Sequence, residues 1–205
     1  MKDLEHIVAR IEAELDEKDE VREVALKSTR AIVRLAGSAL RGMHRGDDVE
    51  VPLAQAREET HNLRALLQGH PDLWYGGAVE GALQEVAEAA IVHNILNGTA
   101  LPEPRELGIP SPAYLLGLAD AIGELRRFVL DHLRAGQIEN ATHYLEIMED
   151  MFDALLRFDH PNAIVPLRRK QDIARGLVER TRGELAVAAR GTELEKKLNE
   201  VARKL

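Results

Sequence analysis

The chain has 205 residues, of which 45% are hydrophobic, and its formal net charge at pH 7 is -8. It contains no cysteine, which excludes disulfides, thiolate zinc sites and cysteine nucleophiles. Its negative net charge argues against binding nucleic acid through the overall charge of the protein. No stretch reaches the roughly 18 uncharged apolar residues of a membrane span, and residues 1–15 predict an amphipathic helix and not a signal peptide. We therefore expect a cytosolic protein with no membrane partner.

Helix-forming residues dominate the chain and predict an all-α bundle. Ala, Leu, Glu and Arg are abundant, aromatic residues make up 3%, and β-branched residues do not alternate with polar ones. Segments rich in Gly, Pro, Asn and Asp divide the chain into about six or seven helices. These segments cover residues 46–52, 68–73, 97–112, 135–137 and 158–166. At this length we expect a single domain spanning residues 1–205.

A basic surface is predicted on the first long helix. No acid occurs between Ala25 and Gly46, and the basic residues are spaced so that they share one helix face. This basic stripe consists of Lys27, Arg30, Arg34, Arg41 and Arg45, with His44 beside it. In an acidic protein such segregation favours contact with nucleic-acid phosphates, and a solvated helix edge is the alternative. Because no aromatic residues interleave the basic ones, we expect contacts with the charged nucleic-acid backbone in preference to base stacking.

Two acids interrupt ALQEVAEAAIV, residues 82–92, which is otherwise apolar on nearly every side. Glu85 and Glu88 lie three residues apart and therefore on one helix face. A polar strip this narrow predicts a central helix. Acids on such a helix must be paired, protonated, bound to metal or exposed to a wet cavity, because an isolated buried carboxylate is too costly.

The segment YLLGLADAIGELRRFVLDHL, residues 114–133, repeats this pattern with Asp120 and Glu124 four residues apart. If the two strips face each other, four carboxylates converge, and their repulsion raises their pKa values unless a cation neutralises them. Oxygen ligands without Cys or an evident His favour Mg²⁺ or Mn²⁺. An ordinary solvated edge on each helix is the alternative.

The remaining motifs predict structural roles. An apolar stripe along residues 137–156 predicts a helix that faces a bundle core. Glu58 and His61 form one E-x-x-H, but a di-iron bundle needs two copies. His93 and His143 are expected to be ordinary hydrogen-bonded residues. The charged segment RGTELEKKLNEVARKL is expected to end a long helix that packs against a partner chain.

The segments YLLGLADAIGELRR and LQEVAEA, with SALRGMHRGD more loosely, resemble the translin superfamily, in particular translin-associated factor X (TRAX) and its archaeal relatives. The resemblance covers most of the chain. It implies a translin-like all-α fold that assembles into a closed, barrel-shaped homo-octamer. It also implies a metal-dependent ribonuclease whose catalytic and metal-binding carboxylates fall on Glu85, Glu88 and Asp120, with Glu124 adjacent in the same motif. Translin itself lacks this acid set.

These observations together predict an Mg²⁺- or Mn²⁺-dependent endoribonuclease that cleaves single-stranded RNA within a homo-oligomer. Because a lone chain must supply its own RNA-binding surface, the basic stripe is the predicted RNA contact. One alternative is a non-catalytic oligomer that binds single-stranded RNA or DNA and whose acids are structural. A helical scaffold without nucleic acid is the other. Metal-dependent turnover separates the first hypothesis from both, and salt-sensitive binding separates the second from the third.

Overall fold

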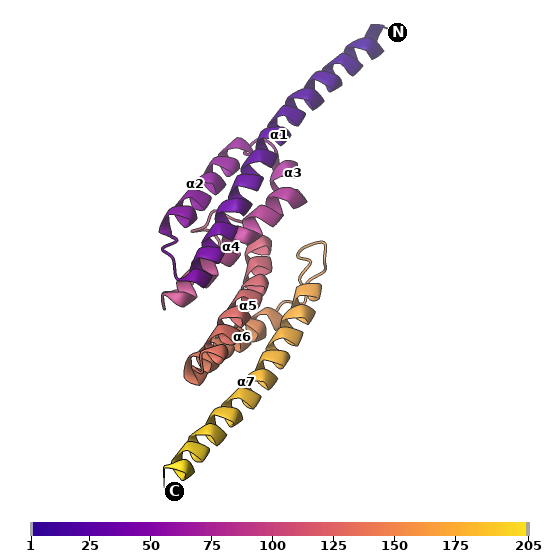
Figure 1. Ribbon diagram of the computed structural model, residues 1–205. Coiled ribbons are helices and arrows are strands. Elements are labelled where there is room, and N and C mark those ends of the chain that lie inside the picture. The colour runs from indigo at the N-terminus through magenta and orange to yellow at the C-terminus, as the bar shows by residue number, and fades with distance from the viewer. Residues whose placement is uncertain (1, 204–205) are drawn as a thin grey trace. The chain divides into compact units, whose positions relative to one another are not determined.

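The computed structural model describes residues 2–203, where all regular secondary structure is helical (Figure 1). The helices in this range are α1 (Lys2–Arg45), α2 (Glu50–Leu66), α3 (Pro71–Trp74), α4 (Gly77–Leu96), α5 (Ser111–Arg134), α6 (Ile138–Leu156) and α7 (Arg168–Ala202). The all-α prediction is confirmed. By its internal contacts the chain divides into two compact units, Met1–Tyr114 and Leu115–Leu205, with the division inside α5. The single domain expected from length stays a prediction.

The helices end close to where Gly, Pro, Asn and Asp predicted breaks, with three differences. Helix α2 begins at Glu50 and includes Pro52, which is tolerated because first-turn N–H groups have no partner within a helix. The predicted break at 68–73 contains the four-residue α3. A break before α4 that the pattern did not predict lies at Gly76, whose backbone is extended with φ -74° and ψ 147°.

Two glycines end long helices by adopting a left-handed backbone. Gly46, with φ +74°, follows α1, and Gly136, with φ +71°, follows α5. After α1, the Gly46 N–H donates to Met43 O at 3.1 Å and the Asp47 N–H donates to Gly42 O at 3.0 Å. This paired pattern satisfies carbonyls that would otherwise lack partners, and it favours glycine because a Cβ is disfavoured at positive φ. It turns the chain sharply from α1 into α2.

The core of the first unit lies between α1, α2 and α4, which pack side by side (Figure 1). Fully buried side chains from all three helices meet there, among them Ile32, Leu63, Leu83 and Ile91. Helix α4 is buried on almost every side, as its narrow polar strip predicted. Gly42 permits a close approach, because a Cβ there would lie 2.6 Å from Val49 Cγ1.

The second unit joins α5, α6 and α7. Along α6 the predicted apolar stripe is buried at Ala141, Leu145, Met148 and Leu155, and α6 packs against α7. The Arg126 guanidinium on α5 donates two hydrogen bonds to Glu184 on α7, at 2.8 and 2.9 Å. No helix in the described part of the chain is long and apolar enough to cross a membrane.

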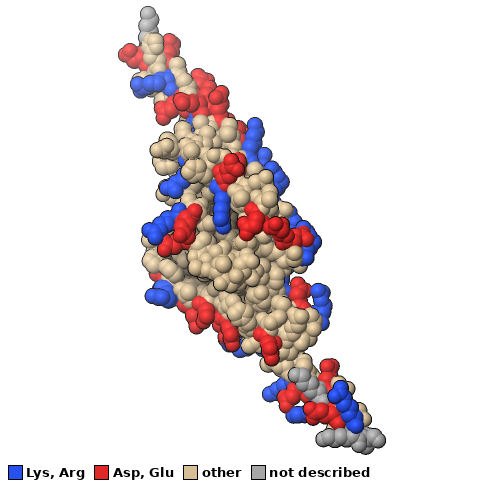
Figure 2. All heavy atoms as spheres, turned by 90° about the vertical axis from the view of Figure 1, so that its left-hand side faces the viewer, with Lys and Arg blue, Asp and Glu red and all other residues tan. Residues whose placement is uncertain are grey.

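Both terminal helices carry exposed apolar side chains far from these cores. On α1 they include Leu4, Val8, Ile11 and Leu15, and on α7 they include Val187, Leu194, Leu198 and Val201. The N-terminal part of α1, at the top of Figure 2, is surrounded mainly by acidic groups. The large exposed apolar side chains near the start of α1 and near the end of α7 indicate surfaces that a folded partner would cover.

Candidate functional site

The first predicted acid pair lies in the middle of α4. Glu88 is 8% exposed and is the one ionisable side chain among the buried residues that the structure describes, whereas Glu85 is half-buried. The neighbouring positions Val86, Ala87 and Ala89 are buried and apolar. A carboxylate at this depth must share its charge with donors or a cation, because burial penalises the ionised form.

The second predicted pair lies on α5, in the other unit. Asp120 is half-buried, and both of its carboxylate oxygens accept hydrogen bonds from the Lys170 ammonium on α7, at 2.5 and 2.6 Å. Glu124 lies one turn further along, and its carboxylate accepts hydrogen bonds from Arg127 Nη1 at 2.9 and 3.2 Å. The carboxylate charges of this pair therefore lie against cationic side chains of their own unit.

The four acids are divided two and two between the units. Glu85 and Glu88 belong to the first unit, and Asp120 and Glu124 belong to the second. Within the part of the chain that the structure describes, no group of three or more His, Asp and Glu side chains is arranged to hold a metal ion. Convergence of all four carboxylates stays a prediction.

Lys170 is a site residue that sequence reasoning missed. It occupies the first turn of α7 in the run Arg168, Arg169, Lys170, and its side chain is 23% exposed. Arg168 in the same run forms an exposed ion pair with Asp159 instead. The sequence signal was only a short basic run after Pro166, which does not indicate which of the three cations meets an acid fifty residues earlier.

The basic stripe lies on α1, on the face away from the buried residues of that helix. Lys27, Arg30, Arg34, Arg41 and Arg45 are all exposed, and His44 is half-buried. Arg45 forms an ion pair with Asp47 at 2.6 Å, which partly neutralises the positive charge of Arg45. A Cβ at Gly37 would lie 3.2 Å from Arg41 Nη1, so the Arg41 guanidinium lies back along the helix. The face is accessible to a polyanion, as its periodicity predicted.

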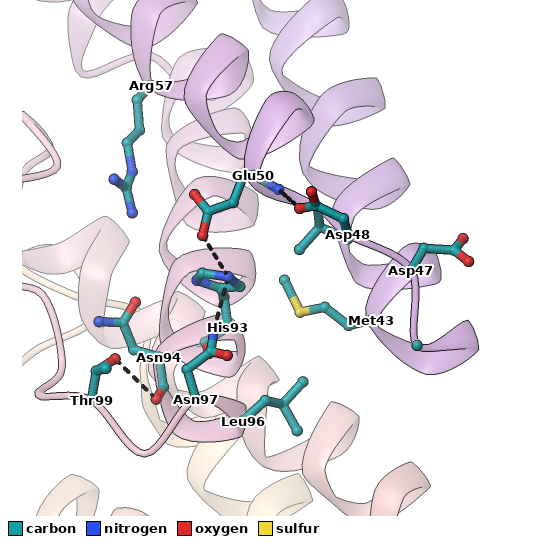
Figure 3. A pocket seen from close by; sticks show the side chains of 12 residues that line it. Met43, Asp47, Asp48, Glu50, Arg57, His93, Asn94, Leu96, Asn97 and Thr99 are labelled. Atoms are coloured by element: carbon teal, nitrogen blue, oxygen red, sulfur yellow. Dashed lines mark hydrogen bonds and ion pairs between the residues drawn. The ribbon is translucent and has the colours of Figure 1, made fainter.

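A cleft of about 650 Å³ lies in the first unit between the end of α1, the start of α2 and the end of α4 (Figure 3). His93 Nε2 lies 3.4 Å from Glu50 Oε1 and 3.0 Å from Asn97 Nδ2. Arg57 extends along the same opening. His93 is thus a hydrogen-bonded residue, as predicted, and its partners here are a carboxylate and an amide.

The helical architecture defines an all-α protein of the translin type. The Translin family model matches residues 16–182, and the chain belongs to this family. An uncharacterised protein of Methanocaldococcus jannaschii, MJ0175, is 34% identical over 190 residues, which are 91% of this chain and 85% of that protein. The resemblance drawn from the sequence is confirmed at the level of the superfamily.

Solved structures match over a similar share of the chain. AfC3PO in a complex with duplex RNA has a TM-score of 0.83 and 30% identity, and the match covers 90% of this chain and 97% of that one. A crystal structure of AfC3PO gives the same values. The apo-NeC3PO structure has a TM-score of 0.79 and 21% identity over 88% of this chain and 96% of that one, and it supports the fold alone.

Proposed function

We propose that this protein is a metal-dependent endoribonuclease of the TRAX type, which cleaves single-stranded RNA within an oligomer of identical chains. The complex of AfC3PO with duplex RNA supports RNA as the ligand, because that protein is 30% identical to this chain. The nuclease proposal rests on one observation: each of two largely apolar helices carries a pair of acids. One of these acids, Glu88, is buried. Acids at such positions are costly unless they bind a cation or a strong donor.

We expect the carboxylates of the two acid pairs to bind a hard divalent cation. Glu85, Glu88 and Asp120 would hold it, with Glu124 as a further ligand, and carboxylate oxygens are the ligands that Mg²⁺ and Mn²⁺ prefer. Both oxygens of Asp120 accept hydrogen bonds from Lys170, so a divalent ion would bind Asp120 in competition with that ammonium. A bound ion would supply an activated water at neutral pH and neutralise charge on the phosphate.

The other residues would bind and position the strand. Lys27, Arg30, Arg34 and Arg41 are exposed cations on one face of α1, and their attraction for phosphates does not depend on base sequence. Before an ion binds, the Lys170 ammonium would hold the Asp120 carboxylate in place through two hydrogen bonds. Geometry and charge, more than covalent chemistry, are the protein's contribution in this mechanism.

A second candidate is an oligomer that binds RNA without cleaving it. The exposed basic stripe favours this function because binding through the stripe needs no metal. Both candidates predict salt-sensitive affinity for RNA, and only the first predicts turnover. Labelled single-stranded and duplex RNA, incubated with Mg²⁺, with Mn²⁺ and with chelator, separates the two candidates.

Neutralising the acids tests the proposed site. We expect Glu85→Gln, Glu88→Gln and Asp120→Asn each to abolish most cleavage, because each removes a metal ligand, while RNA binding persists through the stripe. Mg²⁺ should raise the melting temperature of the parent and raise it less in the variants, because a ligand that binds only the native state stabilises it. Glu58→Gln, an exposed acid on α2, is the matched control. Wild-type-like cleavage by all three variants would remove these carboxylates from the mechanism.

A further inference from the structure

The first four turns of α1 present an apolar face that the chain leaves exposed. Leu4, Val8, Ile11 and Leu15 are between 47% and 59% exposed. Their spacings alternate between four and three residues, as the apolar positions of a heptad do when two helices wrap around each other. The pattern stops at Lys18, whose Nζ lies 2.5 Å from Asp72 on α3. The exposed face is therefore confined to the part of α1 that precedes the packed unit.

The last turns of α7 carry a second face of the same kind. Val187, Leu194, Leu198 and Val201 are between 57% and 74% exposed. They are spaced seven, four and three residues apart, and Gly191 occupies the position that completes the same period. Each of these helix ends thus has one half of a coiled-coil seam.

The charges beside the two seams are opposite in sign, except for Glu195, which follows Leu194 on α7. Glu5 and Glu12 directly follow Leu4 and Ile11, and Glu14 directly precedes Leu15, so these acids border the seam of α1. On α7, Arg190 precedes Gly191 and Lys197 precedes Leu198. Residues 3–20 contain eight acids and two bases, whereas residues 187–205 contain three acids and five bases. Residues that border a seam select the partner helix by charge.

We propose that the N-terminal seam of α1 in one copy pairs with the C-terminal seam of α7 in a second copy. Pairing of α1 with α1 would place Glu5, Glu12 and Glu14 against like charges, which is destabilising. Pairing of α1 with α7 can instead place Glu5 and Glu12 against Arg190 and Lys197. Lys197 already has an exposed ion pair with Glu193 one turn away, at 2.6 Å, but a pair of that kind contributes little and is readily exchanged.

The same charges favour parallel helices. In a parallel pair, a residue that precedes a seam position on one helix faces a residue that follows a seam position on the other helix. Arg190 and Lys197 on α7 would therefore face Glu5 and Glu12 on α1. In an antiparallel pair, Glu195, which follows Leu194, would face those two glutamates instead. The contact is heterologous, because two different surfaces meet, so it builds a closed ring or an open chain of copies.

Charge reversal with rescue tests this pairing. Glu5→Lys with Glu12→Lys changes the α1 seam, and Arg190→Glu with Lys197→Glu changes the α7 seam. By light scattering, each double variant should have a mass about twofold or more below that of the parent at equal concentration, because the variant copies repel each other at this interface. Mixing the two variants should restore the mass, since alternating copies again place opposite charges at every interface. The quadruple variant should assemble by itself.

The control reverses Asp16 and Glu17, which lie on the face of α1 opposite the seam and give the same change in net charge. This control should keep the parent's mass, and circular dichroism should show unchanged helix content in every variant. If the α7 variant alone keeps the parent's mass, or if mixing restores nothing, the pairing is wrong. Those results would leave the proposed RNA function and oligomer intact, because other surfaces would then join the copies.

Discussion

Asp120 shows how a single cation on a neighbouring helix can hold a predicted metal ligand. Its two oxygens bind the Lys170 ammonium, and both side chains are less than one third exposed. A half-buried carboxylate without a counter-charge is unfavourable, so Lys170 supplies in the folded chain the positive charge that a divalent ion would also supply.

Removing Lys170 should make stability depend more strongly on metal. In chelator, we expect Lys170→Ala to lower the free energy of unfolding by about 1–3 kcal/mol, because the Asp120 carboxylate no longer has its charged hydrogen-bond partner. Mg²⁺ should raise the melting temperature of this variant more than that of the parent. Arg168→Ala, which removes an exposed cation from the same helix turn, is the control. If Mg²⁺ raises the melting temperatures of both variants equally, Lys170 does not act at the proposed metal site.

Helix α1 combines a buried face in the first unit with an exposed row of cations. Replacing Arg30, Arg34 and Arg41 together by Ala should weaken RNA binding regardless of base sequence. On a plot of log affinity against log salt, the slope should flatten by about 0.7 for each phosphate of a single strand that the variant no longer neutralises. Replacement of Arg168, Arg175 and Arg182 on α7 removes equal charge and should leave the slope unchanged. If the α1 and α7 replacements change the slope equally, the basic stripe is an ordinary solvated face.

The contact of α5 with α7 has its own dependence on pH. Hydrogen bonds from Arg126 hold the pKa of Glu184 below its ordinary value of 4.5. The stabilisation is therefore fully present above pH 4.5 and is lost as pH falls through the lower folded-state pKa. Because the Glu184 side chain is 40% exposed, we expect it to contribute about 1 kcal/mol or less.

Thermal unfolding of the parent and of Glu184→Gln at a series of pH values measures this contribution. The parent should melt at a higher temperature near neutral pH, and the difference should shrink on acidification below pH 4.5, as the carboxylate becomes protonated. A difference that stays constant or grows in acid would contradict the role assigned to this ion pair. Glu149→Gln should show a smaller difference throughout, because its partner Arg182 is 61% exposed, whereas Arg126 is 15% exposed.

At the scale of the whole molecule, the exposed apolar faces of α1 and α7 require partners. We predict a closed homo-octamer, which the translin resemblance implies and which would bury both faces. Light scattering should give a mass eight times that of the chain, and the mass should hold across micromolar dilutions. A protein that stays monomeric at these concentrations would contradict the octamer and the pairing of α1 with α7 together.

Local patterns in the sequence determined the helices, because helix ends depend on neighbouring residues. Gly46 and Gly136 end helices where the glycine pattern predicted. The break at Gly76 was not predicted, although the consecutive glycines Gly76 and Gly77 are typical of a turn. Periodicity also placed the basic stripe on an exposed face of α1 and Glu88 on a buried helix. These features repeat every three or four residues, so they can be recognised without the fold.

Only the tertiary structure decided which distant side chains meet. Lys170 binds Asp120 across fifty residues of chain, and Arg126 binds Glu184 across fifty-eight. Nothing local distinguishes Lys170 from Arg168 two residues earlier, because the choice depends on how α7 is rotated against α5 in the folded unit. The C-terminal segment that contains Leu198 was expected to pack against a partner chain, but periodicity did not show by itself that Leu4 and Leu15 are exposed. An apolar stripe that binds a partner and one that faces its own core have the same periodicity.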